Sequence, residues 1–442
     1  MSVGHHQHHL VHRSPRGAAG QRGERGFLGA WIRARSREER IFVGCLAIIG
    51  IHLAVVALVF PGGAGVLARV GLLLAAAVGP VVLGALFVAR GGVVRGLLAA
   101  LVGLGAAVVG LATSVPDAAL TGLGGADLTG ILATVAGIIL VGLAFWIALR
   151  GRRLVVKLVV AIPAVFVIAQ WLIEPAINAG IATHAPRPSI ASASTLGLPG
   201  ARDVTFPARD GTRLAGWYVP GRTGAAVILL HGSHGTRTET LAHLRMLAAD
   251  GYGVLAFDAR GHGLSSGETN ALGWRGVDDI AGAVNFLDRQ PGVDSRWIAA
   301  LGLSMGGEEA LRAAAGGIPL RAIVADGAGA STLGDQQIVP HGLAPVYNSE
   351  TWLSMRAIGL ISGEPEPPPL KTIVAHIRVP VLLIASNASN ERAIDDAYRQ
   401  RIGPNATLWY LPDTSHTNGL ATHPRAYAAR VGAFLRATFA QR

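Results

Sequence analysis

The chain has 442 residues, of which 51% are hydrophobic and only 15% are charged, and its formal net charge is +11. Soluble proteins average about 25% charged residues, so this composition excludes a purely soluble chain. Residues 1–190 hold 16 Lys and Arg against 6 Asp and Glu, whereas residues 191–442 hold 22 against 21. Because the basic half also carries the long apolar runs, the charge favours a membrane protein and argues against a nucleic-acid partner.

The first 40 residues are predicted to form a disordered basic tail. They show no apolar periodicity, and eight arginines lie between Arg13 and Arg40. Such a segment cannot bury enough apolar surface to fold by itself. The single cysteine, Cys45, lies in the apolar run that follows, which excludes a disulfide within the chain and a cysteine-based zinc site. We expect no metal and no cofactor.

Five apolar stretches predict a transmembrane domain over residues 41–174. About 20 apolar residues are enough to cross the hydrocarbon core of a bilayer. The connecting segments alternate in charge, since the turns at 90–95 and 150–153 carry arginines and residues 113–129 carry none. Arginine-rich connections stay in the cytoplasm, which predicts a multi-pass protein of the cell membrane with a cytoplasmic N-terminus and an extracytoplasmic C-terminal half. The five stretches are residues 41–60, 70–89, 93–112, 130–149 and 154–173.

The pattern changes twice in the second half of the chain. Residues 175–201 are rich in turn formers, lack a period and are predicted to be a linker. From residue 202 to residue 442, short apolar runs alternate with helical stretches, which predicts an α/β domain with a mostly parallel sheet covered by helices. The expected strands are residues 203–208, 213–219, 225–230, 253–257, 297–301, 320–325, 379–385 and 406–411.

Two glycine-containing motifs follow strands of this domain. Gly302-Leu-Ser-Met-Gly306 comes after the strand 297–301 and precedes a helical stretch, the context in which G-x-S-x-G places its serine on a strained turn. Upstream, His231-Gly-Ser-His-Gly235 follows the strand 225–230. We expect the backbone N–H groups of Ser233 and Met305 to bind an oxyanion there.

These motifs, with the segments Phe257–Ser265 and Thr414–Thr417, resemble those of the α/β-hydrolase family over a little more than half of the chain. The resemblance implies an α/β-hydrolase fold and a serine hydrolase whose nucleophile, acid and histidine follow one another in that order. It implies Ser304 as the nucleophile. It implies His416, in the loop after the last strand, as the base.

The acid of this triad is less clearly marked. The family often carries Gly-x-x-Asp after the strand at 379–385, whereas this chain reads Ser386-Asn-Ala-Ser-Asn-Glu391. Glu391 is the first carboxylate reached, and glutamate can hold the imidazole as aspartate does. Asp395, in the next helical stretch, and Asp326, after the strand at 320–325, remain alternatives.

The Pro-rich segment 331–370 shows no strong period and is predicted to form a short lid over the pocket. We expect Tyr347, Trp352, Met355 and Ile358 to line it.

The expected substrate is an acyl ester, including lipid-like esters close to the bilayer. Acyl transfer or peptide cleavage by the same three residues are alternatives, as is a membrane sensor or scaffold with an idle hydrolase fold. The sequence does not indicate an oligomeric state.

Overall fold

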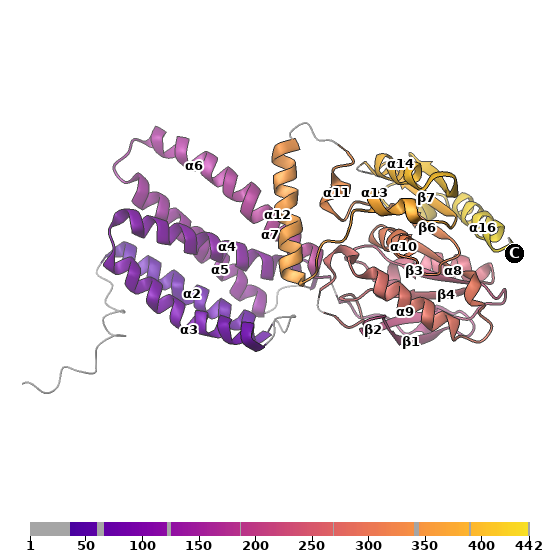
Figure 1. Ribbon diagram of the computed structural model, residues 1–442. Coiled ribbons are helices and arrows are strands. Elements are labelled where there is room, and N and C mark those ends of the chain that lie inside the picture. Colours follow the sequence, from indigo (N-terminus) through magenta and orange to yellow (C-terminus); the bar gives the residue numbers. More distant parts are fainter. Residues whose placement is uncertain are drawn as a thin grey trace, which may run out of the picture.

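The computed structural model describes residues 36–59, 66–121, 125–185, 187–267, 269–339, 344–388 and 390–440. It contains a helical N-terminal region and an α/β C-terminal domain, joined by helices that pack between them (Figure 1). Most of the predicted basic tail, residues 1–40, lies outside the described residues.

Helices cover the five predicted apolar stretches within the described part of the chain, and five helical segments there are long and apolar enough to cross a membrane. The fifth helix is longer than predicted. It passes from α6 through the π-helical turn η1 into α7, so that the apolar segment spans Leu154–Thr183. The helices are α2 Arg37–Val59, α3 Val66–Ala89, α4 Gly92–Thr121, α5 Gly125–Leu149, α6 Leu154–Ile168, η1 Ala169–Ile173 and α7 Glu174–Thr183.

The linker prediction for residues 175–201 is therefore wrong at its beginning. Pro175 does not end the helix, because the preceding turn is π-helical and Pro175 falls in the first turn of α7, where a missing N–H is tolerated. Irregular backbone begins after Thr183 and is interrupted by one short turn of 3₁₀ helix at Ala193–Leu196.

Close backbone contact joins α4 and α5. A Cβ atom added to Gly103 would lie 2.7 Å from the carbonyl oxygen of Gly137, and one added to Gly137 would lie 2.5 Å from that of Gly103. Glycine at both positions thus lets the two helix backbones touch, which is how membrane helices gain packing energy in the absence of a hydrophobic driving force.

The arginine-bearing turns lie together at one end of the bundle. Arg95 forms an ion pair with Glu39 at 2.9 Å, and Arg150 pairs with Glu38 at 3.4 Å, both at the start of α2. From this end α6 runs toward the C-terminal domain (Figure 1). Arg95 and Arg150 therefore lie at the end of the helical bundle opposite the C-terminal domain, as the alternation of charge along the sequence predicts. Which end of the bundle faces the cytoplasm stays a prediction.

The C-terminal domain contains an eight-stranded sheet in the order β1-β2-β4-β3-β5-β6-β7-β8. β2 is antiparallel to both of its neighbours, and the strands from β4 to β8 in this order pair in parallel. The predicted α/β class is confirmed. The strands are β1 Arg202–Pro207, β2 Arg213–Val219, β3 Ala226–Leu230, β4 Gly253–Phe257, β5 Ile298–Leu303, β6 Ile323–Asp326, β7 Val381–Ser386 and β8 Ala406–Leu411.

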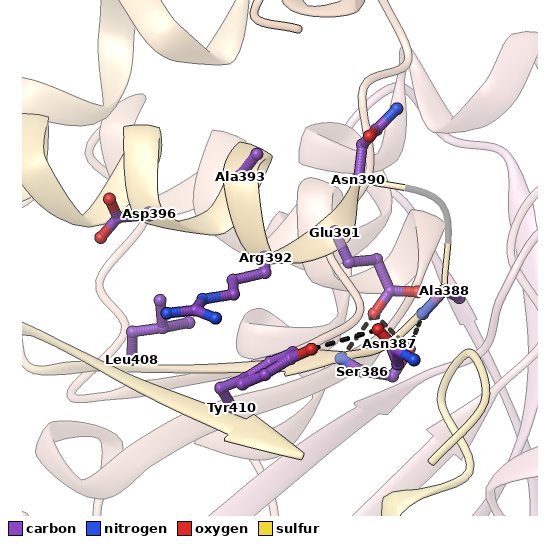
Figure 2. Close-up of a pocket in the computed structure, with 10 residues that line it drawn as sticks. All are labelled: Ser386, Asn387, Ala388, Asn390, Glu391, Arg392, Ala393, Asp396, Leu408 and Tyr410. Atoms are coloured by element: carbon purple, nitrogen blue, oxygen red, sulfur yellow. Dashed lines mark hydrogen bonds between the residues drawn. The ribbon is translucent and has the colours of Figure 1, made fainter. Parts of the chain in front are cut away.

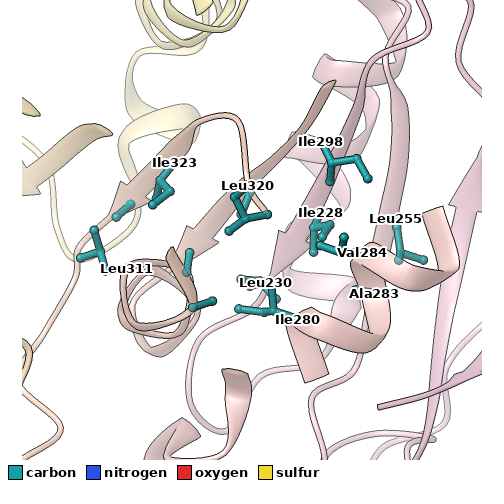
Figure 3. Packing of buried hydrophobic residues seen from close by; sticks show 14 of the residues in the cluster. Ile228, Leu230, Leu255, Ile280, Ala283, Val284, Ile298, Leu311, Leu320 and Ile323 are labelled. Carbon is teal, nitrogen blue, oxygen red and sulfur yellow. The ribbon is translucent and has the colours of Figure 1, made fainter. Parts of the chain in front are cut away.

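Helices cover both faces of this sheet. On one face, Ile228 and Leu230 of β3 pack with Leu311 and with side chains from the helix at 276–288 (Figure 3). On the other, the alternate residues Val227 and Leu229 pack in a second cluster. The β3 side chains are buried on both faces, so the sheet is a rigid base whose parallel strands end at one edge. The helices are α8 Leu241–Ala249, α9 Gly276–Asp288, α10 Met305–Ala315, α13 Leu370–Ile373, α14 Glu391–Ile402, α15 Gly419–Thr422 and α16 Pro424–Ala440.

The segment predicted as an irregular lid contains α11 (Leu333–Gln336) and the 19-residue helix α12 (Ala344–Ser362). The absence of a strong apolar period in this segment did not reveal these helices. Polar Thr351 and Ser354 occupy the buried face of α12 together with Met355, so the helical spacing is not visible as an apolar pattern. α12 packs against α7, between the membrane helices and the α/β domain (Figure 1).

The contact between α4 and α5 gives a first prediction. Gly137→Ala should lower the thermal midpoint of the detergent-solubilised protein, because the new methyl group would overlap the α4 backbone. Gly142→Ala is the matched control in the same helix, since nothing lies within 4 Å of its added Cβ; alanine there should leave the midpoint unchanged or raise it. Equal midpoints for the two variants in a fluorescence-detected melting experiment would contradict the close contact.

Candidate active site

Ser304 lies on a sharp turn between β5 and α10, where its backbone adopts φ +51° and ψ −117°. Neighbouring glycines make this turn possible. A Cβ atom on Gly302 would lie 2.1 Å from the carbonyl oxygen of Gly306, and one on Gly306 would lie 2.6 Å from the Cβ of Leu230. Only hydrogen fits at either position, so the G-x-S-x-G spacing is a steric requirement of this turn.

His416, in the loop after β8, lies between Ser304 and Glu391. Its Nε2 atom is 2.9 Å from the Ser304 Oγ atom, and its Nδ1 atom forms a hydrogen bond with Glu391 Oε1. Because the carboxylate only accepts, Nδ1 carries a proton and Nε2 is left to accept one from the serine. The structure thus brings together the three residues that the sequence predicted, in one chain of hydrogen bonds.

Glu391 is the first residue of α14, and its buried carboxylate is held at the end of β7. Its Oε2 atom accepts hydrogen bonds from the backbone N–H and the hydroxyl of Ser386, each at 2.8 Å (Figure 2). Sequence reasoning did not find Ser386, because no motif marks it. Ser386 donates both hydrogen bonds to the carboxylate oxygen of Glu391 that does not bond to His416. These bonds hold the longer side chain of the glutamate in place.

The contact between Glu391 and His416 shifts both pKa values. The hydrogen bond that His416 donates to Glu391 raises the pKa of His416 above its usual value. Burial alone would raise the pKa of Glu391, but the hydrogen bonds from His416 and Ser386 outweigh it and the pKa falls. The imidazolium that forms when His416 takes a proton is therefore stabilised by a carboxylate that stays ionised.

The two alternative acids lie outside this chain of hydrogen bonds. Asp326, at the end of β6, accepts a hydrogen bond from the Tyr427 hydroxyl at 2.8 Å, and burial raises its pKa to about 7. Asp395 is fully buried in α14, and within the described part of the chain its carboxylate oxygens have no hydrogen-bond partner. Burial raises its pKa well above the usual value. The geometry favours Glu391 over both.

The loop that follows β3 lies against the serine, since a Cβ added to Gly232 would be 3.4 Å from the Ser304 Cβ. Two contacts hold this loop. Gly232 donates its backbone N–H to Glu239 Oε2 at 3.0 Å, and His231 Nε2 accepts from the Ala259 N–H at 3.0 Å. Burial lowers the pKa of His231 to about 4, so it remains neutral and structural. The loop therefore lies against Ser304 at Gly232, the residue before Ser233, and Glu239 is a contributor that no sequence motif had marked.

A family model described as X-Pro dipeptidyl-peptidase (S15 family) matches residues 210–421. The YfhR protein of Escherichia coli K12 is 31% identical over 166 residues, which are 35% of this chain and 58% of YfhR. The Rv2307c protein of Mycobacterium tuberculosis is 38% identical over 120 residues, 26% of this chain and 42% of its own length. The chain thus spans about half the length of these relatives.

A solved esterase from Pyrococcus furiosus is 26% identical, with a TM-score of 0.46, and the match covers 57% of this chain and 97% of that one. Three features of this domain are those expected of an α/β-hydrolase fold: the strand order, the serine turn after β5 and the histidine after β8. The S15 match over residues 210–421 agrees with that fold. The C-terminal domain has the α/β-hydrolase fold. Its resemblance to the S15 family extends over residues 210–421 and not over the membrane helices.

Two cavities border the catalytic edge of the hydrolase domain. One, of about 430 Å³, lies behind Glu391 between α14 and β8 (Figure 2) and includes neither Ser304 nor His416. The other, of about 310 Å³, is lined by α7, α12 and His234 of the loop after β3. No group of three or more residues suited to a metal ion occurs among the residues that the structure describes.

Three of the four side chains predicted to line the lid pocket do so, in the second cavity: Tyr347, Met355 and Ile358. Trp352 is not among the lining residues and is 46% exposed. The sequence could not separate these positions, because the side of α12 that each side chain occupies depends on how the helix is placed on α7.

Glu391→Gln should lower the pKa of His416, because it removes the carboxylate that raises it. Ser304 reacts when His416 is neutral and can accept its proton. We expect the acid limb of fluorophosphonate labelling against pH to move to lower pH, with a plateau rate lower by up to about 10⁴-fold. Asp395→Asn is the control. It should retain the wild-type acid limb, and an unmoved limb in Glu391→Gln would contradict the assignment of the acid.

Proposed function

We propose that the protein is a membrane-anchored serine hydrolase that cleaves acyl esters through a covalent acyl-enzyme. The observation that carries this proposal is the continuous chain of hydrogen bonds from Glu391 through His416 to a serine on a strained turn. A merely structural serine has no need for a neutral imidazole nitrogen at 2.9 Å or for a left-handed backbone. The S15 match and the esterase name of a structural neighbour agree with this reaction class.

In the proposed first half-reaction, Ser304 Oγ attacks the acyl carbonyl carbon while His416 Nε2 takes the hydroxyl proton. The carbonyl oxygen becomes an oxyanion, which the backbone N–H groups of Ser233 and Met305 stabilise; one such donor contributes roughly 3 kcal/mol. His416 then gives its proton to the leaving alkoxide oxygen. The carbon–oxygen bond breaks and the alcohol departs, leaving the acyl group on Ser304.

The second half-reaction repeats these steps with water. His416 takes a proton from a water molecule as its oxygen attacks the acyl-enzyme, and the collapse of the second oxyanion returns the proton to Ser304 and releases the carboxylic acid. Glu391 stays ionised throughout and orients the imidazole. An alcohol in place of water would give acyl transfer by the same residues.

Peptide cleavage is the second candidate, favoured by the S15 family match over residues 210–421. An amide differs from an ester in its leaving group, which must be protonated by His416 before it departs. A comparison of an acetyl ester with the corresponding amide as substrates separates the two reactions. The intact chain of hydrogen bonds argues against an idle scaffold.

Ser304→Ala should abolish both labelling by a fluorophosphonate and hydrolysis of p-nitrophenyl acetate, because it removes the only atom proposed to bond to the acyl group. Ser415→Ala is the control, since Ser415 is an exposed serine next to His416 in the chain. Both assays should remain at wild-type level in this variant. Labelling of Ser304→Ala at the wild-type rate would refute the proposed nucleophile.

We also propose that the N-terminus is cytoplasmic and the hydrolase domain extracytoplasmic. The ion pairs of Arg95 and Arg150 with the start of α2 place the basic connections at the end opposite the hydrolase domain, and basic connections remain in the cytoplasm. Alkaline phosphatase fused after Arg442 should be active. A green fluorescent protein fused there, which requires the cytoplasm, should be dark; the reverse result would overturn the orientation.

A further inference from the structure

The cavity of about 310 Å³ that His234 lines is built from both parts of the chain. Ile181 and Ala182 of α7 form one side, and α12 forms another. His234, the neighbour of Ser233, and Leu272 complete the wall. Leu272 adjoins Gly273, whose added Cβ would lie 2.9 Å from the Met305 side chain. The cavity is thus lined by the chain neighbour of Ser233 and by the chain neighbour of a glycine that lies against Met305.

α7 places this cavity at the level of the membrane surface. The apolar helix from Leu154 to Thr183 has 30 residues, whereas the hydrocarbon core of a bilayer takes about 20. The remaining ten residues extend about 15 Å beyond it, and they are those of α7. Trp171, just before α7, has the side chain that favours the boundary between hydrocarbon and water. The α7 wall of the cavity therefore lies just outside the hydrocarbon.

α12 turns one face toward this boundary. Ser349, Trp352, Arg356 and Leu360 follow one another at spacings of three and four residues and so share a face. Ser349 Oγ accepts a hydrogen bond from Trp171 Nε1 at 2.8 Å, which fixes that face next to the end of the last membrane helix. The Arg356 guanidinium lies 5.5 Å from the centre of the Trp352 ring.

Two apolar side chains of this face are exposed, Leu360 at 85% and Trp352 at 46%, and Arg356 lies between them in the chain. Among the described residues of the hydrolase domain, three of the four exposed large apolar side chains belong to α12, namely Trp352, Leu360 and Ile361; the fourth is Leu264. A soluble domain gains nothing from three such side chains on one helix. The opposite face of α12 contributes Thr351, Met355 and Ile358 to the cavity.

We propose that α12 rests on the membrane surface and that the substrate is a long-chain lipid ester drawn from the bilayer, whose hydrocarbon chain enters the cavity between α7 and α12. This inference rests on the proposed hydrolase function. The side chains of Ile181, Ala182 and Leu272 on one side and of Met355 and Ile358 on the other suit a hydrocarbon chain. His234 lies at the end next to Ser233, where the ester carbonyl would meet Ser304.

The test uses the full-length protein in phosphatidylcholine vesicles, with rates divided by the fraction of protein that reacts with a fluorophosphonate. p-Nitrophenyl acetate serves as the soluble ester, and a dioleoylglycerol embedded in the same vesicles serves as the lipid ester. Leu360→Asp should reduce hydrolysis of the lipid ester by about tenfold or more, because it removes apolar contact with the bilayer. It should change hydrolysis of the soluble ester by less than about twofold.

Leu264→Asp is the matched control, an exposed leucine of the same domain outside α12, and it should leave both rates at wild-type level. Met355→Trp tests the cavity separately. The larger ring fills the space meant for the chain, so the lipid ester should react at least about tenfold more slowly while the acetyl ester reacts normally.

The inference is overturned if Leu360→Asp and Leu264→Asp hydrolyse the lipid ester equally fast, or if Met355→Trp slows both esters equally. The proposed function fails in a different way. In that case the wild-type protein does not hydrolyse the soluble ester, or Ser304→Ala hydrolyses it at the wild-type rate.

Discussion

Backbone crowding around Ser304 is the constraint on which the rest of the site depends. The carbonyl oxygen of Gly306 lies where a side chain on Gly302 would be, and β3 lies where a side chain on Gly306 would be. This crowding holds the serine in a left-handed conformation that a free chain would rarely adopt. The strain is sustained because β3, β5 and β6 are buried on both faces and pair in register, with Leu230 opposite Gly302 and Leu303 opposite Asp326.

The same parallel arrangement explains how residues 112 positions apart in the chain come into contact. The loops after β3, β5, β7 and β8 leave the sheet at one edge. The segments that follow these strands carry Gly232, Ser304, Glu391 and His416, respectively. Two hydrogen bonds then fix the acid and the loop: Ser386 donates to Glu391, and Gly232 donates to Glu239. The relative positions of these residues are therefore set mainly by the ends of the strands, which the rigid sheet holds at constant spacing, and less by any single contact.

The last of the five apolar helical segments also contributes to the hydrolase domain. α6, η1 and α7 form one helix, and α7 supplies one wall of the cavity that His234 lines. A hydrogen bond from Trp171 to Ser349, and another of 3.3 Å from Asn178 to Glu350, connect this helix to α12. A rotation or displacement of this helix would therefore change the shape of the cavity.

The sequence alone determined the features that depend on local pattern. Length and hydropathy predicted the five apolar stretches, and periodicity predicted the alternation of strands and helices. The spacing of the glycines predicted Ser304, because one steric rule explains that spacing. His416 and Glu391 were reached through the family's chain order, although the family's Gly-x-x-Asp is absent. Only the tertiary structure decided among Glu391, Asp395 and Asp326, because all three are buried carboxylates and only Glu391 reaches His416. It also decided that α7 and α12 are helices flanking a shared cavity, since their buried faces include polar residues whose partners come from distant parts of the chain.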